Sequence, residues 1–253
     1  MSDTHRKGNN IIYGRKPILD ALAEGKRFER IFLRDNLSGE FEKEIRALCK
    51  TSLIPLKKVP AIKLDKLTRK RNHQGIVGIG SIVEYQGLSD VIPHIYENGE
   101  SPLLVLLDNI QDVRNIGAIA RSAETLGAQG IILSGNNAGM ITHDSLKASA
   151  GALSRINVSR EKNTLQTIAF LKDHGIKTIG SSVRAEKSVF DLSLTAPICL
   201  VLGSEGPGLQ KNVEDECDYI AKIPQIGRTD SLNVSVACGI ILYEIQRQTF
   251  VNE

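Results

Sequence analysis

Residues 103–121 run Leu103-Leu-Val-Leu-Leu-Asp-Asn-Ile-Gln-Asp-Val-Arg-Asn-Ile-Gly-Ala-Ile-Ala-Arg121. The first five are apolar without interruption, which is typical of a parallel strand buried on both faces. A polar loop follows, and residues 115–126 have the apolar spacing of a helix. This strand, loop and helix are the repeating unit of an α/β protein.

The same alternation continues to the end of the chain. Expected strands are residues 130–133, 156–159, 176–181, 198–202 and 219–223, and expected helices are residues 145–154, 164–174, 209–216 and 232–248. Strands that alternate with helices predict a parallel sheet covered on both faces. We therefore expect an α/β domain over residues 102–253.

A second, smaller unit is expected before it. Apolar periodicity predicts strands at residues 31–34, 54–59 and 75–83, and helices at residues 17–23, 40–51 and 61–68. Residues 1–84 should thus form a small α/β domain. Residues 85–101 contain glycine, proline and asparagine without a sustained pattern, which favours a linker.

Charge differs between these two parts. Residues 1–84 hold 18 Lys and Arg against 10 Asp and Glu, a net of +8; this leaves 14 against 19, a net of −5, for residues 85–253. Seven cations between Lys57 and Arg71 are opposed only by Asp65. A basic cluster attracts a polyanion, so RNA or DNA is the expected partner, and a solvated charged surface is the alternative.

The remaining composition argues against a metal site, a membrane span and a secretory signal. The four cysteines form no C-x-x-C pair and the five histidines lie at no ligand spacing near them, so we expect reduced structural thiols and no metal. The longest apolar runs are strand-sized, which predicts no membrane span. Residues 1–10 are polar and lack the apolar core of a secretory signal, so the expected location is cytoplasmic.

Ligands bind at the carboxyl ends of parallel strands, which directs attention to three loops. In the first, Asn115 is either a helix N-cap or a functional side chain, and Arg121 is either a functional or an ordinary surface residue. Gly117 lets something approach the start of that helix closely, which hints at a ligand.

The second loop is Leu202-Gly-Ser-Glu-Gly-Pro-Gly208, and its three glycines make either a tight turn or a backbone surface for an adenine or ribose. It lacks the spacing of a dinucleotide fingerprint, and no P-loop occurs in the chain. The third loop, residues 223–237, leads into the last expected helix with small and polar residues, including Ser231, which could cap that helix.

Together these loops resemble the three motifs of the SpoU/TrmH branch of the SPOUT methyltransferases. The motifs are N-x-G-x-x-x-R at residues 115–121, L-G-S-E-G-x-G at residues 202–208, and S-L-N-V-S-x-A at residues 231–237. Residues 13–14 and 73–76 (Tyr-Gly and His-Gln-Gly-Ile) are similar to the ribosomal-protein-like substrate domain of the 23S rRNA guanosine 2′-O-methyltransferases of this family.

The resemblance implies a deep trefoil knot, a homodimer and S-adenosylmethionine (AdoMet) as methyl donor. It implies cofactor contacts at Gly203, Ile223 and Leu232, and a reaction side formed by Glu205, Ser231 and Asn233 with Asn115 and Arg121. The expected activity is methyl transfer to a ribose 2′-hydroxyl of structured RNA.

Methyl transfer from a sulfonium requires an activated hydroxyl more than an assisted leaving group. A guanidinium with a pKa of about 12.5 to 13.8 is a poor base near pH 7. We therefore expect Arg121 to hold the neighbouring phosphate and stabilise the forming alkoxide, with Asn115 orienting it and proton loss occurring late.

Three other functions are compatible with parts of the pattern. A tRNA 2′-O-methyltransferase would share the motifs, and a non-catalytic RNA-binding or ribosome assembly factor would share the fold. A nucleotide-dependent oxidoreductase would share only the α/β alternation, and the dinucleotide glycines are missing.

Overall fold

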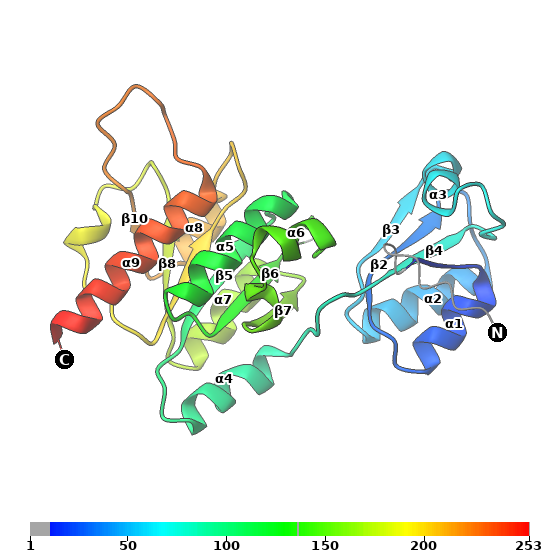
Figure 1. Ribbon diagram of the computed structural model, residues 1–253, viewed down its shortest axis with the longest axis horizontal. Helices are drawn as coiled ribbons and strands as arrows, with labels where there is room; N and C mark the ends of the chain where they lie inside the picture. Colours follow the sequence, from blue (N-terminus) through cyan, green and yellow to red (C-terminus); the bar gives the residue numbers. More distant parts are fainter. Residues whose placement is uncertain (1–10, 136, 253) are drawn as a thin grey trace. The chain divides into compact units, whose positions relative to one another are not determined.

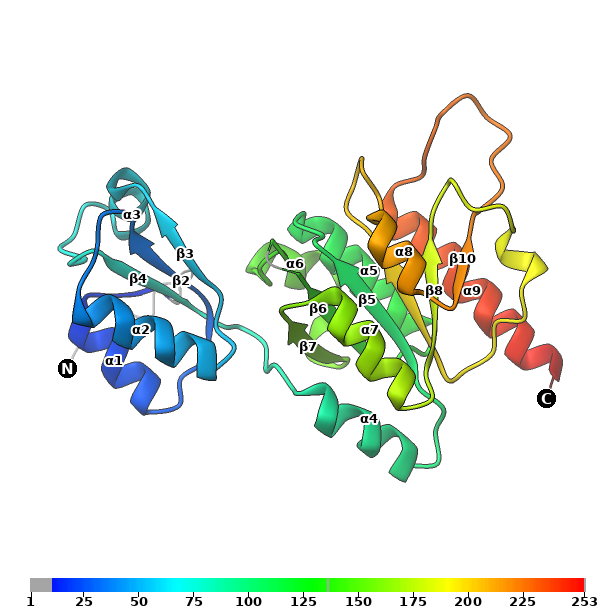
Figure 2. The same cartoon turned by 180° about the vertical axis from the view of Figure 1, so that it is seen from behind.

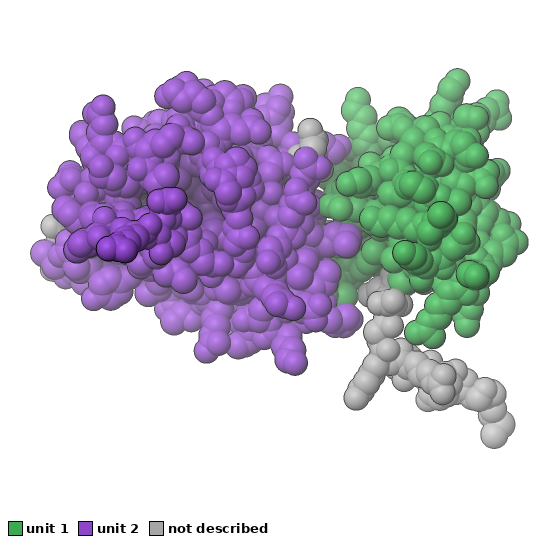
Figure 3. All heavy atoms as spheres, turned by 90° about the horizontal axis from the view of Figure 1, so that it is seen from above, with its two compact units in different colours: residues 1–84 green, residues 85–253 purple. Residues whose placement is uncertain are grey.

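The computed structural model describes residues 11–135 and 137–252, so the interpretation of residues 1–10 falls outside the described part. The chain divides into two compact units, one ending at Glu84 and the other beginning at Tyr85 (Figure 3). Each unit has its own sheet and its own apolar core (Figure 1).

The first unit has a four-stranded sheet in the order β1-β4-β2-β3. Its elements are β1 (Ile11–Tyr13), α1 (Arg15–Ala23), β2 (Phe28–Arg34), α2 (Glu40–Thr51), β3 (Leu56–Val59), α3 (Ala61–Thr68) and β4 (Ile76–Gly80). Because neighbouring side chains of a strand point to opposite faces, Ile31 and Leu33 pack in the core under α1 and α2, while Phe32 packs with Leu64 of α3.

The second unit has a six-stranded parallel sheet in the order β10-β8-β9-β5-β6-β7. Its strands are β5 (Leu103–Asp108), β6 (Gly130–Ser134), β7 (Asn157–Glu161), β8 (Lys177–Ser181), β9 (Ile198–Leu202) and β10 (Tyr219–Ala221). Its helices are α4 (Leu88–Glu97), α5 (Val113–Thr125), α6 (His143–Ala148), α7 (Thr164–Asp173), α8 (Lys211–Glu216) and α9 (Val234–Asn252), with 3-10 turns at Ala152–Ser154 and Val189–Asp191.

Helices cover both faces of this sheet, as the sequence predicts. Helices α4, α7 and α8 lie on one face and α5, α6 and α9 on the other (Figures 1 and 2). Leu104 and Leu106 of β5 belong to the core on the α4 side, and all six residues of β5 are buried. The uninterrupted apolar run therefore marks the centre of a parallel sheet. No helix in the described ranges is long and apolar enough to cross a membrane.

The expectation of a linker over residues 85–101 is wrong, because residues 88–97 form α4. Leu88, Val91, Ile92 and Ile95 are at most 4% exposed and belong to the core of the second unit. Pro93, the sixth residue of α4, makes the segment look like a linker, because proline is unusual inside a helix. The spacing 88, 91, 92, 95 is nevertheless that of an amphipathic helix.

The expected helix over residues 145–154 is also interrupted. Helix α6 ends at Ala148, and Ala150 (φ 49°) and Gly151 (φ 86°) adopt left-handed conformations before a 3-10 turn begins. Thr142 starts α6 with a capping box to Ser145. The other expected strands and helices are confirmed with shifts at their ends.

Candidate active site

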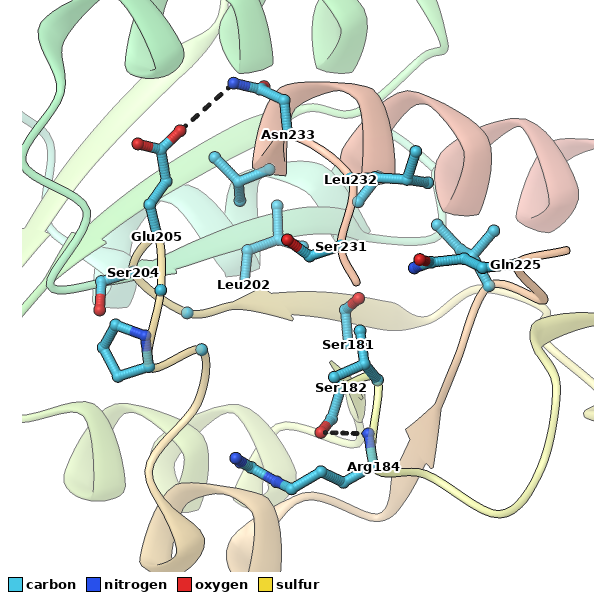
Figure 4. A pocket seen from close by; sticks show the side chains of 18 residues that line it. Ser181, Ser182, Arg184, Leu202, Ser204, Glu205, Gln225, Ser231, Leu232 and Asn233 are labelled. Carbon is cyan, nitrogen blue, oxygen red and sulfur yellow. Dashed lines mark hydrogen bonds between the residues drawn. The ribbon is translucent and has the colours of Figure 1, made fainter. Parts of the chain in front are cut away.

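A cavity of about 290 Å³ lies at the carboxyl ends of β8 and β9 and beside the segment that follows β10 (Figure 4). This is where parallel α/β sheets place their ligands. Four segments of the chain line it. They are residues 181–184, residues 202–208, the pair Ile223 and Gln225 after β10, and five residues around the start of α9: Ser231, Leu232, Asn233, Val234 and Ala237.

The loop over residues 202–208 forms one wall of this cavity and closes on itself. The amide of Gly208 donates to the carbonyl of Ser204 at 2.9 Å, and Gly206 and Gly208 have φ values of 85° and 69°. A Cβ at Gly203 would collide with the backbone of Gly208 and Leu209. The tight turn is confirmed, since only glycine fits at Gly203, and the turn lines the cavity; its contact with an adenine or ribose stays a prediction.

Three side chains from distant parts of the chain meet at one end of the cavity. The side-chain amide of Asn115 donates to Oε1 of Glu205 at 2.5 Å. The amide nitrogen of Asn233 lies 3.2 Å from that same carboxylate oxygen (Figure 4). It also lies 3.2 Å from Oδ1 of Asn115. We call Asn115, Glu205 and Asn233 the amide–carboxylate cluster.

Asn115 is not a helix cap. Asp112 caps α5 by accepting from the backbone N–H of Arg114 at 2.7 Å, and Asn115 lies in the first turn of the helix with its side chain 7% exposed. At the start of α9, Asn233 accepts at Oδ1 from the backbone N–H of Ser235 at 2.8 Å. This bond fixes the Asn233 side chain, so its N–H₂ group points toward Glu205.

The other expected site residues divide into two groups. Gly203, Ile223, Ser231 and Leu232 all line the cavity. Arg121 does not: it is exposed on α5, it makes no hydrogen bond or ion pair within the described residues, and six helical residues place it roughly 9 Å along the axis from Asn115.

The structure adds a wall that the sequence reasoning missed. Residues 181–184 follow β8 and line the cavity opposite Glu205 (Figure 4). Arg184 bonds the Leu209 carbonyl at 2.9 Å and the Glu214 carboxylate at 2.6 Å. Burial raises the pKa of Glu214, but hydrogen bonds from Ser182 and Arg184 outweigh it, and the pKa is lowered. The signal was available, since β8 also ends at the ligand-binding edge.

Gly117 serves packing between helices. A Cβ there would collide with the carbonyl of Ser145 and lie 2.6 Å from Cβ of Ala148. The close approach that the sequence suggested is therefore made by α6, and the ligand interpretation of Gly117 is wrong.

The cysteines are all free thiols, and Cys49, Cys199 and Cys238 are buried. Burial raises the pKa of Cys238 to about 12, which suppresses the reactive thiolate. Within the described ranges, no group of three or more His, Cys, Asp or Glu residues is arranged to hold a metal ion.

A parallel sheet, a cavity at its carboxyl edge and a polar cluster beside that cavity define an α/β enzyme with its ligand site at the strand ends. The chain belongs to the SpoU rRNA methylase family, whose model matches residues 102–243. A second model, described as RNA 2′-O ribose methyltransferase substrate binding, matches residues 11–86. The protein is an RNA methyltransferase, which confirms the resemblance of the motifs.

Known relatives cover nearly the whole chain. A protein of Bacillus subtilis (strain 168), named as a TrmH family tRNA/rRNA methyltransferase, is 32% identical over 98% of both chains. An AdoMet-bound rRNA methyltransferase from Sinorhizobium meliloti is 27% identical, with a TM-score of 0.60 over 94% of this chain and 87% of that one. The AdoMet complex of the SpoU methyltransferase AviRb from Streptomyces viridochromogenes is 26% identical, with a TM-score of 0.61 over 95% and 90%.

Proposed function

We propose that this protein transfers a methyl group from AdoMet to a ribose 2′-hydroxyl of structured RNA, with a guanosine of 23S rRNA as the target. The observation that carries the proposal is the amide–carboxylate cluster beside the cavity. A tRNA ribose is the second candidate, because the Bacillus relative is named for both RNAs. This activity favours the cytoplasm as the location.

The cavity suits AdoMet in shape and chemistry. Leu202, Ile223, Leu232 and Val234 give an apolar lining for an adenine, and the turn at residues 203–208 offers backbone groups to its polar edge. Glu205 puts a negative charge at the same cavity, where it can face a cation. AdoMet bound here supplies a methyl group attached to a positively charged sulfonium.

The amide–carboxylate cluster would position the ribose. Two amide N–H groups donate to Oε1 of Glu205, so one carboxylate oxygen is fixed by the protein. The other oxygen remains to accept from a substrate hydroxyl. Holding the hydroxyl in line with the methyl group lowers the entropy cost of the transfer.

Arg121 would act on the RNA phosphate. Its side chain is exposed and has no partner among the residues that the structure describes, which leaves the whole guanidinium for a phosphate oxygen pair. A phosphate held there would carry the neighbouring ribose toward Asn115 and would favour the forming alkoxide. This role needs the RNA to extend along α5 from the cavity.

We also propose a homodimer that buries α9. One face of this helix, with Cys238, Ile241, Leu242 and Ile245, is already at most 1% exposed. A second stripe of the helix is apolar and exposed: Val236, Ile240, Tyr243 and Phe250 are 38–70% exposed. An exposed apolar stripe of this kind indicates an interaction surface, and a second copy of the chain would cover it.

The trefoil knot remains a proposal that rests on the resemblance of the three motifs. The first unit, in turn, is proposed as the RNA-binding domain on the basis of its charge of +8 over residues 1–84, from 18 basic and 10 acidic residues.

The decisive experiment maps 2′-O-methylation in rRNA and tRNA from cells with and without the protein. Loss of one ribose methyl in 23S rRNA is the expected result. Loss at a tRNA position would select the second candidate. Unchanged methylation in both RNAs, together with no calorimetric AdoMet binding, would overturn the proposal in favour of a non-catalytic RNA-binding factor.

A further inference from the structure

A second cavity, of about 450 Å³, lies within the first unit. It is formed where β2 ends, where α1 begins and where the turn before β4 reverses the chain. Its lining residues are Arg15, Arg34, Leu37, Asn72, His73, Gln74 and Gly75, and none of them is acidic. We call it the Arg34 cavity.

The turn over residues 73–75 builds the frame of this cavity. Gln74 and Gly75 adopt left-handed conformations in succession, with φ values of 50° and 81°. Gln74 accepts at Oε1 from the backbone N–H of Arg15 at 2.9 Å, and Gly75 accepts at its carbonyl from the backbone N–H of Arg34 at 2.9 Å. One turn therefore fixes the backbone of both arginines.

The polar groups of the turn are already engaged. His73 accepts at Nδ1 from the backbone N–H of Gly75 at 3.0 Å, and its Nε2 lies 3.3 Å from a carboxylate oxygen of Asp65. These bonds hold the wall in place and leave Arg34 and Arg15 as the charged groups of the cavity.

The guanidinium of Arg34 has an unsatisfied nitrogen. Its Nε is buried and makes no hydrogen bond within the described residues. The adjacent Asp35 turns its carboxylate to the backbone N–H of Asn36 and does not line the cavity. A buried charged donor without an acceptor costs free energy that an anion would return as a charge-assisted hydrogen bond.

Arg15 adds a second cation at the same cavity. Its guanidinium lies over the ring of Phe41, 4.8 Å from the centroid, which orients it without neutralising it. Two arginines and no carboxylate favour a phosphate, because guanidinium groups match phosphate oxygens in pairs. The volume far exceeds that of a water, which occupies about 30 Å³ in the liquid, so an attached sugar also fits.

We propose that the Arg34 cavity binds one phosphodiester of the RNA substrate, with Arg34 and Arg15 as its ligands. The inference rests on the proposed RNA substrate, and it assigns a defined phosphate site to a unit that the substrate-binding family match and the net charge mark only as a whole. Through this contact the first unit would fix the position of the RNA along its own surface.

The test compares Arg34→Met with Arg46→Met in the full-length protein. Methionine preserves the apolar stem and removes the charge in both. Arg46 lies on α2 and is already paired with Glu42 at 2.8 Å, so it controls for the loss of one positive charge. Filter binding of purified 23S rRNA between 50 and 300 mM KCl gives the association constant and its salt dependence.

Arg34→Met should weaken RNA binding roughly tenfold and reduce the slope of log K against log salt by about 1, while Arg46→Met should leave both near wild type. Equal losses in the two variants, or no loss in Arg34→Met, would refute the site. If Arg34→Met fails to fold by circular dichroism, Arg15→Met, which alters an exposed side chain, must give the same pattern or the site is refuted.

Two controls separate this inference from others. AdoMet binding measured by calorimetry should be identical in Arg34→Met and wild type; if the wild type bound no AdoMet, the proposed function would fail while the RNA result still tested the cavity. Inorganic phosphate at constant ionic strength tests for a free anion. If Arg34→Met lost only phosphate binding and kept RNA binding, the RNA assignment would be wrong.

Discussion

The side-chain amide of Asn115 lies 2.5 Å from Oε1 of Glu205, although 90 positions separate the two residues in the chain. The contact joins the helix after the central strand β5 to the turn after its neighbour β9. Asn115 is only 7% exposed, so its polar side chain needs a hydrogen-bond partner, and that partner comes from a distant part of the chain.

Asn115→Ala should lower kcat for RNA methylation roughly 100-fold, because removing one preorganised donor from a reaction site typically has an effect of that order. AdoMet affinity should stay within about threefold, since Asn115 does not line the cavity. Steady-state kinetics and calorimetry measure the two quantities. As a control, Asn163→Ala removes the N-cap of α7 at the same edge of the sheet and should leave kcat near wild type. If Asn163→Ala lowered kcat as much as Asn115→Ala, the effect would come from a general disturbance of this edge.

Arg121→Lys should also lower kcat, by about 10- to 100-fold, because a lysine cannot hold a phosphate through the two-point contact of a guanidinium. Single-turnover assays with saturating RNA and AdoMet give this rate. Arg114→Lys, an exposed change about two turns earlier in α5, is the matched control. Near-full turnover in Arg121→Lys would exclude the bidentate role.

Gly203→Ala should abolish measurable AdoMet binding, because the new Cβ would displace the backbone of Gly208 and Leu209 and open the turn. Gly227→Ala provides the comparison, since a Cβ there would have no atom within 4 Å. Calorimetry with AdoMet distinguishes the two variants. Wild-type affinity in Gly203→Ala would mean that the 203–208 turn does not shape the cofactor site.

Gly117→Ala should reduce the free energy of unfolding by about 1–3 kcal/mol, the usual effect of overpacking, since α5 and α6 would be forced apart. Urea unfolding followed by circular dichroism measures it. Gly239→Ala in α9 is the helical control: its Cβ would meet only Ser122, at 3.7 Å or more, so stability should be unchanged or raised by up to about 1 kcal/mol. A stable Gly117→Ala protein would show that the crossing is loose.

Ile240→Asp combined with Tyr243→Asp should shift the protein from dimer to monomer in sedimentation velocity, because two charges would be buried in the proposed α9 interface. Ile62→Asp changes an apolar residue of the first unit that is 68% exposed, and it should leave the mass unchanged. A wild-type protein that sediments as a monomer at all concentrations would contradict the interface directly.

Sequence patterns predicted the parallel sheet because the period of apolar residues reports burial, and burial of β5 and β9 is complete. Of the eight site residues that the ordered motifs predicted, seven line the cavity or belong to the amide–carboxylate cluster, since backbone turns require particular residues at fixed spacing. Arg121 lies outside this group, and its contact with an RNA phosphate stays a prediction. The wall at residues 181–184 was missed because the sequence indicates that β8 ends at the ligand-binding edge but does not indicate that β8 lies next to β9 in the sheet.

Helix α4 has a practical consequence for dissecting the protein. A catalytic fragment cut at residue 102, where the methylase family match begins, would remove Leu88, Val91, Ile92 and Ile95 and expose the part of the sheet face that α4 covers beside α7 and α8. Such a fragment should aggregate on expression, whereas one cut at residue 85 retains the helix that shields that surface. The place to separate the two halves is therefore before the helix, at the end of the RNA-binding unit.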